Sequence, residues 1–88
     1  MIKELRVAAR RDPDGIVCVH AYGKCPRAIL DEIVDELGGY CVMENPLTYT
    51  NRVKTEVALK TYLSVLIAHG WKIAGKSETD IILNRSDT

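Results

Sequence analysis

Residues 12–15 read Asp-Pro-Asp-Gly, and this tetrapeptide restricts the fold of the chain more than any other segment. Asp, Pro and Asp favour a type I turn, and the glycine can adopt the left-handed conformation that closes the turn with a bulge. The flanking segments are rich in β-favouring residues, so the turn predicts an antiparallel hairpin. Its geometry also sets the register, which pairs Asp12 with Ile16, Arg11 with Val17, Ala9 with Val19, and Val7 with Ala21.

The predicted register divides the hairpin side chains between two faces. One set is apolar and is expected to pack on the core: Leu5, Val7, Ala9, Val17, Val19 and Ala21. The other set is expected on a face that stays open to water or a ligand: Arg6, Ala8, Arg10, Cys18, His20 and Tyr22. The alternation and the turn chemistry are independent observations, and both predict the same hairpin.

Two helices are predicted from apolar spacing and from residues that start and stop helices. Pro26 suits the first position of a helix, and the glycines at 38 and 39 suit its end. Between them an apolar stripe recurs with helical spacing: Ile29, Leu30, Ile33, Val34 and Leu37. The second helix is expected from Asn51 or Arg52 to His69, with Gly70 as its stop.

The remaining segments predict three further strands. Tyr40–Glu44 is expected to form a short strand that ends at Asn45 and Pro46, and residues 71–75 and 80–85 are expected to form a closing hairpin. The element order ββαβαββ predicts an α+β fold, a single-domain two-layer sandwich whose mainly antiparallel sheet carries both helices on one face. Residues 1–88 are expected to form one compact domain, with residues 86–88 as a frayed tail.

The second predicted helix carries more apolar residues than one sheet requires. The side expected to cover the sheet is formed by Val53, Val57, Leu63, Leu66 and Ile67, with Leu59 at its margin. Ala58, Tyr62 and Val65 widen this apolar arc. One interpretation is a central helix that is deeply buried. The other is an interface with a second copy or a protein partner, for which the candidate residues are Leu59, Tyr62 and Leu66.

Cys25 is the candidate for a reactive thiol. A predicted strand, a short loop and then Cys25 and Pro26 at a helix start resemble the thiol-redox entry of thioredoxin-like and glutaredoxin-like folds. Ala28 stands where those folds place a resolving cysteine, so the resemblance implies a monothiol redox domain that uses Cys25. A helix N-terminus lowers the pKa of a thiol, and the positive charges of Lys24 and Arg27 act in the same direction.

Cys18, His20, Cys25 and Cys41 are the residues that could ligate a metal. Their spacing lacks the paired knuckles, with two to four residues between ligands, that are typical of structural zinc sites, so we expect no metal and no cofactor. Three cysteines cannot pair completely within one chain. The first residues lack the apolar segment of a secretory signal, so we expect free thiols and a cytoplasmic location.

Composition and charge narrow the class of function. The chain is 47% hydrophobic and 27% charged with a formal net charge of zero, which is typical of a globular protein and not of a polyanion-coating one. No apolar run approaches the roughly 20 residues of a membrane span. No catalytic triad or glycine-rich phosphate loop is present in the sequence. We therefore expect a small non-catalytic accessory, inhibitor or regulatory protein that binds a protein partner or forms a homodimer.

Two alternatives stay open. One is the monothiol redox domain that uses Cys25. The other is a nucleic-acid-binding module, in which Arg6 and Arg10 neutralise phosphates beside His20 and Tyr22 on the open side of the sheet.

Overall fold

The structure is a computed structural model that describes residues 2–51 and 55–86. The strands and helices of these ranges follow in the order β1 (Ile2–Arg11), β2 (Val17–Tyr22), α1 (Arg27–Leu37), β3 (Tyr40–Glu44), β4 (Leu47–Asn51), α2 (Thr55–Ala68), β5 (Lys72–Lys76) and β6 (Ile81–Ser86). The strands form one six-stranded sheet in the order β3-β4-β2-β1-β6-β5, and every neighbouring pair is antiparallel.

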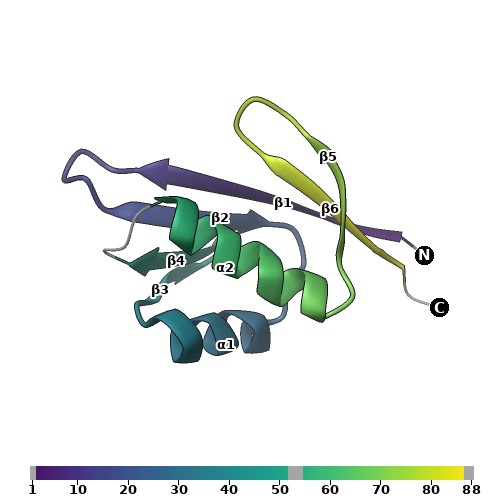
Figure 1. Ribbon diagram of the computed structural model, residues 1–88, viewed down its shortest axis with the longest axis horizontal. Helices are drawn as coiled ribbons and strands as arrows, with labels where there is room; N and C mark the ends of the chain where they lie inside the picture. The colour runs from purple at the N-terminus through teal and green to yellow at the C-terminus, as the bar shows by residue number, and fades with distance from the viewer. Residues whose placement is uncertain (1, 52–54, 87–88) are drawn as a thin grey trace.

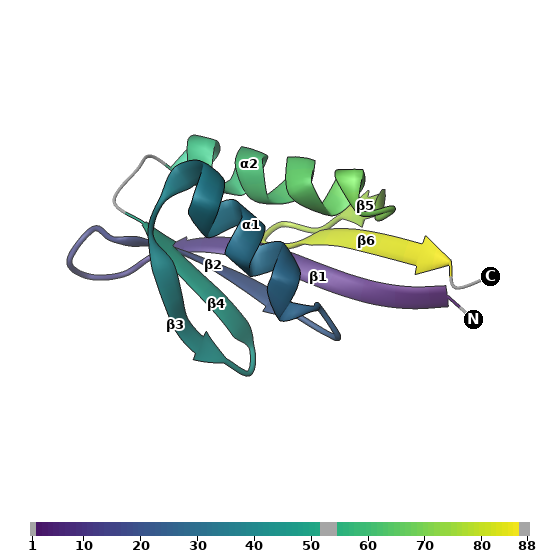
Figure 2. The ribbon, with the colours of Figure 1, turned by 90° about the horizontal axis from the view of Figure 1, so that it is seen from below.

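Both helices lie on the same side of this sheet (Figures 1 and 2). Helix α2 packs over β1 and β2, and α1 packs beside α2. The fold is therefore the α+β two-layer sandwich that the sequence predicts. The core fills the space between the two layers, and its largest fully buried side chains are those of Trp71, Tyr49 and Tyr62. Neither helix of the described ranges is long and apolar enough to cross a membrane.

The β1–β2 hairpin has the predicted register. Arg11 is opposite Val17 and Ala9 is opposite Val19, and the amide of Asp12 donates to the carbonyl of Ile16 at 2.9 Å. The Asp12 carboxylate closes the turn, because one of its oxygens accepts hydrogen bonds from the amides of Asp14 at 2.9 Å and Ile16 at 2.8 Å.

Gly15 has a φ of +83°, the left-handed conformation that the bulge requires. We expect Gly15→Val to lower the free energy of unfolding by about 1–2 kcal/mol, because a β-branched residue is strained at this φ. No atom of the described residues lies within 4 Å of a Cβ added at this position, so the expected cost is attributed to backbone strain. Urea denaturation followed by circular dichroism measures the change, and unaltered stability would contradict the role of Gly15 in the turn.

Helix α1 follows the predicted apolar stripe. Ile29, Leu30 and Ile33 are buried, and Val34 and Leu37 pack against the core at its margin. The sequence predicts Pro26 as the first residue of the helix. In the structure Pro26 is extended and the helix begins one residue later, at Arg27. The helix ends at Gly38, whose φ of +82° directs the chain into β3.

One strand is absent from the sequence prediction. The chain does not leave the sheet after β3 but returns through Asn45 and Pro46 into β4, so the element order is ββαββαββ. Strand β4 lies between β3 and β2 and places Leu47 and Tyr49 in the core. The alternation of Leu47, Thr48, Tyr49 and Thr50 is a strand signal, but the proline before it favours an end to the sheet.

The start and the orientation of α2 also differ from the prediction. Asn51 ends β4 and the helix spans Thr55–Ala68, while Arg52 and Val53 lie outside the described residues. Val57 and Ile67, which were expected to cover the sheet, are exposed. The buried side is instead formed by Ala58, Tyr62, Val65 and Leu66, with Leu59 and Leu63 partly buried at its margin.

The closing hairpin of β5 and β6 is confirmed to within one residue at each end. Ser86 is the last residue of β6 and not part of a tail, and residues 87–88 lie outside the described ranges. Ser77 and Asp80 close the turn, where the amide of Ser77 donates to the carbonyl of Asp80 at 2.8 Å.

Candidate functional site

The side of the sheet opposite the helices brings together the residues predicted there. Neighbouring strands pair Arg6 with Tyr22, Ala8 with His20, and Arg10 with Cys18. Strand β4 extends this surface with Thr48 opposite His20 and Thr50 opposite Cys18. We use the name "open face" for this surface, which is formed by Arg6, Ala8, Arg10, Cys18, His20, Tyr22, Tyr40, Met43, Thr48 and Thr50.

The edge strand β3 contributes two residues that the sequence analysis did not place on this face. Tyr40 is opposite Thr50 and Met43 is opposite Thr48, with a bulge between Cys41 and Met43. Tyr40 is 65% exposed, Met43 is 44% exposed and Tyr22 is 40% exposed. They could not be assigned from the sequence, because the face on which β3 side chains lie depends on its pairing with the unpredicted strand β4.

The centre of the open face is held by side-chain hydrogen bonds. The Thr48 hydroxyl donates to the carbonyl of Pro46 at 2.9 Å, and the Thr50 hydroxyl donates to the carbonyl of Val17 at 2.9 Å. His20 Nδ1 lies 3.0 Å from the Thr48 hydroxyl oxygen. Because that hydroxyl already donates its proton to Pro46, His20 Nδ1 is the donor in this contact.

His20 adds no positive charge to the open face at neutral pH. Burial, together with the positive charge of Arg10, lowers the pKa of its imidazole below the ordinary value. The ring lies beside Tyr22, with the two ring centroids 6.1 Å apart. Arg6 is also partly neutralised, because its Nε lies 3.4 Å from a carboxylate oxygen of Glu4.

The candidate interface residues of α2 do not form a surface. Tyr62 and Leu66 are fully buried between the helix and the sheet, and Leu59 is partly buried against the core. The buried residues of the helix form one stripe, which consists of Ala58, Tyr62, Val65 and Leu66, whereas Val57 and Ile67 of the wide apolar arc are exposed. An interface through Tyr62 and Leu66 would require the core to open.

Cys25 lies in the loop before α1, with its sulfur 3.9 Å from the carbonyl oxygen of Pro26. Burial raises the pKa of the Cys25 thiol to about 11, and the Tyr62 hydroxyl beside it offsets only part of this effect. The positive charge of Arg27 does not compensate, because Arg27 pairs with Asp31 at 3.3 Å and with Glu44 at 2.7 Å. The thiol is therefore neutral at pH 7, which is unfavourable for a nucleophile.

We expect the alkylation rate of Cys25 by iodoacetamide to keep rising with pH beyond pH 9, because the thiolate is the reactive form and the thiol pKa is about 11. A Cys18→Ser, Cys41→Ser double variant leaves Cys25 as the single thiol, so the rate reports this residue alone. A rate that reaches its plateau near neutral pH would contradict the expectation and restore the redox alternative.

The four residues considered as metal ligands lie on two sides of the sheet. Cys18 and His20 are on the open face, whereas Cys25 and Cys41 pack against the core on the helix side. In the described part of the chain, no group of three or more histidine, cysteine or acidic side chains is arranged to hold a metal ion.

Comparison of this chain with protein family models, with curated proteins and with solved structures found no match.

Proposed function

We propose that this protein is a non-catalytic binding protein that recognises a protein partner through the open face. The observation that carries the proposal is the grouping of Tyr22, Tyr40 and Met43 with Arg6 and Arg10 on a face that neither described helix covers (Figure 2). Tyrosine, methionine and arginine are enriched at protein interfaces, and tyrosine and arginine dominate their binding energy.

The centre of the face supports a rigid binding surface. Ala8, Thr48 and Thr50 are buried there although neither described helix lies above them, and both threonine hydroxyls are hydrogen-bonded to the backbone. A surface that is ordered before binding loses little conformational entropy when a partner docks. The exposed tyrosine and methionine side chains surround this centre and supply apolar area.

The charge of the open face favours a protein over a nucleic acid. Affinity for nucleic acid depends mainly on the number of phosphates that are neutralised by positive side chains. Here Arg6 is paired with Glu4, His20 is neutral at pH 7, and the chain as a whole has no net charge. Arg10 and the partly paired Arg6 are too few for a phosphate-tracking surface.

The test begins with capture of partners from a lysate of the native host, followed by mass spectrometry, and continues with calorimetry on a purified partner. We expect Tyr40→Ala and Tyr22→Ala each to weaken the affinity by at least about tenfold, because buried tyrosines are typical interface anchors. Ile73→Ala is the matched control, since Ile73 is exposed and lies on the helix side of β5. Sedimentation at micromolar concentration shows whether the partner is a second copy of the chain.

Two results would overturn the proposal. One is an affinity that falls as much for Ile73→Ala as for the tyrosine variants. The other is salt-dependent binding of single-stranded nucleic acid that is lost on charge reversal of Arg6 and Arg10, which would assign the open face to nucleic acid.

A further inference from the structure

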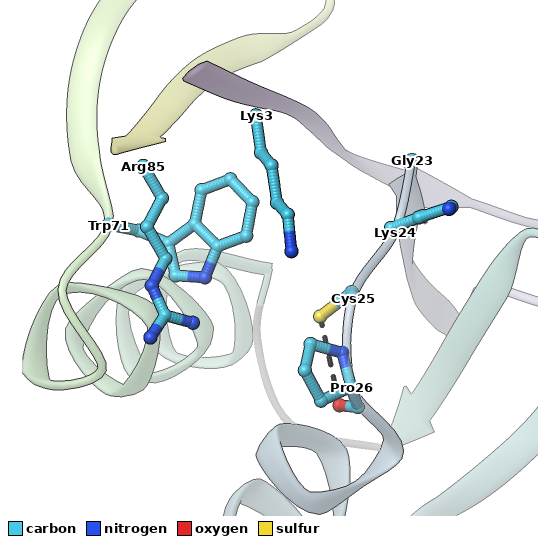
Figure 3. A pocket seen from close by; sticks show the side chains of 7 residues that line it. All are labelled: Lys3, Gly23, Lys24, Cys25, Pro26, Trp71 and Arg85. Atoms are coloured by element: carbon cyan, nitrogen blue, oxygen red, sulfur yellow. Dashed lines mark hydrogen bonds between the residues drawn. The ribbon is translucent and has the colours of Figure 1, made fainter. Parts of the chain in front are cut away.

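A cavity of about 350 Å³ lies on the helix side of the sheet, apart from the open face. Four segments form it: the start of β1, the loop between β2 and α1, the junction of α2 with β5, and the end of β6 (Figure 3). Its lining residues are Lys3, Gly23, Lys24, Cys25, Pro26, Trp71 and Arg85. Three of them are positively charged and none is acidic.

Trp71 lines this cavity and carries a buried polar group that no described residue pairs with. The side chain is 2% exposed, and its indole Nε1 has no hydrogen-bond partner among the described residues. Figure 3 shows Nε1 on the side of the ring that faces Lys3, Cys25 and Arg85. An indole N–H can only donate, and a buried donor without an acceptor costs about 1–3 kcal/mol, so the site favours a ligand that supplies an acceptor.

Trp71 is held in place by the end of α2. Its amide donates to the carbonyl of Leu66 at 3.1 Å, and Gly70, with a φ of +95°, makes the turn from the helix into β5. On the opposite wall, Gly23 lets the loop approach β1, because a Cβ there would lie 2.8 Å from the carbonyl oxygen of Glu4. The cavity is thus built by constrained backbone on both sides.

Positive charge converges on the same space. Lys3 and Arg85 are cross-strand partners on β1 and β6, and they share the helix side of the sheet with the buried pair Leu5 and Leu83. In Figure 3 the Lys3 ammonium group reaches into the cavity and the Arg85 guanidinium lies beside the indole, whereas the Lys24 side chain points away. The thiol of Cys25 is uncharged at pH 7, so it does not repel an anion.

Helix α1 begins at the edge of this cavity and lacks the groups that commonly neutralise a helix start. Its N-cap is Pro26, which provides no side-chain hydrogen bond, and its first turn contains no acidic residue. The N–H of Ile29 donates to the carbonyl of Pro26 at 3.1 Å, whereas the N–H groups before it have no acceptor four residues earlier within the helix, and the dipoles of such groups favour a bound anion. Together with the buried indole donor, this uncapped end indicates a site for an anionic oxygen ligand.

We propose that this cavity binds the phosphate group of a phosphomonoester, held by the Trp71 N–H, the Arg85 guanidinium and the Lys3 ammonium at the start of α1. Arginine and lysine are the side chains that proteins use most to bind phosphate, and a phosphate group accepts hydrogen bonds from several directions at once. The cavity lies at the lower end of the volume range of ligand sites, which leaves room for a small organic group beside the phosphate.

Trp71 is the only tryptophan of the chain, so its fluorescence and its indole ¹⁵N–¹H signal report this cavity directly. We expect both signals to change saturably on titration with phenyl phosphate at constant ionic strength, with the indole proton moving downfield as it gains an acceptor. A tripeptide that contains phosphoserine provides a second titration. Binding of either phosphoester supports the proposal, and the tighter of the two identifies the source of the phosphate group.

Charge variants test whether the response belongs to this cavity. Arg85→Gln and Lys3→Gln are expected to weaken the affinity at least about tenfold, while Lys72→Gln, which removes the same charge on the other side of the sheet, leaves it unchanged. Circular dichroism verifies that each variant is folded. The absence of a saturable response to both phosphoesters in the wild-type protein, or an equal loss in Lys72→Gln, would overturn the proposal.

Discussion

A Gly39→Ala variant is expected to lose about 3–5 kcal/mol of unfolding free energy, which is a large fraction of the roughly 5–15 kcal/mol that is typical of native proteins. Gly39 has a φ of +90°, so any side chain is strained there. A Cβ would also lie in the space of the Thr50 carbonyl oxygen and 2.8 Å from the ring and the hydroxyl of Tyr49. Neither group can move easily, because Thr50 pairs within the sheet and the Tyr49 hydroxyl donates to the carbonyl of Gly38.

Gly38→Ala is the matched control for this experiment. Gly38 has a similar φ of +82°, but in the described part of the chain no atom lies within 4 Å of a Cβ added at this position. The expected loss is about 1–2 kcal/mol from backbone strain alone. Urea denaturation of both variants separates the cost of backbone strain from the cost of the steric clash. Equal losses of unfolding free energy would show that the backbone and side chain of β4 do not approach Gly39 as described.

Removal of the whole Tyr62 side chain and removal of its hydroxyl alone are expected to have different effects on the stability of the protein. Tyr62→Ala should lower the unfolding free energy by about 3–5 kcal/mol, because the ring is fully buried and packs edge-on against Tyr49 with the centroids 6.5 Å apart. Tyr62→Phe should leave stability unchanged or raise it by up to about 1 kcal/mol. Its hydroxyl is buried and forms no hydrogen bond of normal geometry with any described residue.

The Tyr62 variants also distinguish the core from an interface. If Tyr62 contacted a partner, Tyr62→Ala would weaken association and leave the stability of the isolated chain nearly intact. Ile67→Ala is the surface control, because Ile67 is exposed on the same helix and its loss should change stability by no more than about 0.5 kcal/mol. Thermal and urea unfolding of the three variants provide the comparison.

The expected ionisation of Cys25 illustrates a limit of sequence reasoning about sites. Its position before a helix and beside Lys24 and Arg27 is visible in the sequence, and each of these features lowers a thiol pKa. Burial against Tyr62 and the pairing of Arg27 with Asp31 and Glu44 come from the folded structure. The effects of folding outweigh the local ones, so the direction of the pKa shift is reversed.

The cavity at Trp71 depends even more strongly on distant contacts. Lys3 and Arg85 are near opposite ends of the chain and meet only because β1 and β6 pair. Trp71 stands at the start of a strand predicted from the sequence, but its burial beside residues 23–26 is visible only in the folded structure. No local pattern in the sequence marks these residues as one site.

The β1–β2 hairpin, helix α1 and the two-layer fold class could be predicted from the sequence because their determinants are local. Asp12 and Gly15 define the turn within four residues, and the resulting register assigns Arg6, Arg10, His20 and Tyr22 to one face. Alternation with a period of two or of 3.6 residues then separates core from surface without reference to any other element.

Only the tertiary structure decided the place of β4, the orientation of α2, the addition of Tyr40 and Met43 to the open face, and the residues that line the cavity at Trp71. A helix that is apolar on most sides has no preferred buried side of its own, so packing against β1, β2 and α1 selected Tyr62 and Leu66 for the core and left Val57 and Ile67 exposed. Strand β4 pairs with β3 on one edge and with β2 on the other. These two pairings stabilise a strand directly after Pro46, where the local sequence favours an end to the sheet. The buried side of α2 and the position of β4 depend on the sum of contacts between residues that are distant in the sequence. Local hydrophobic patterns contain no information about these contacts.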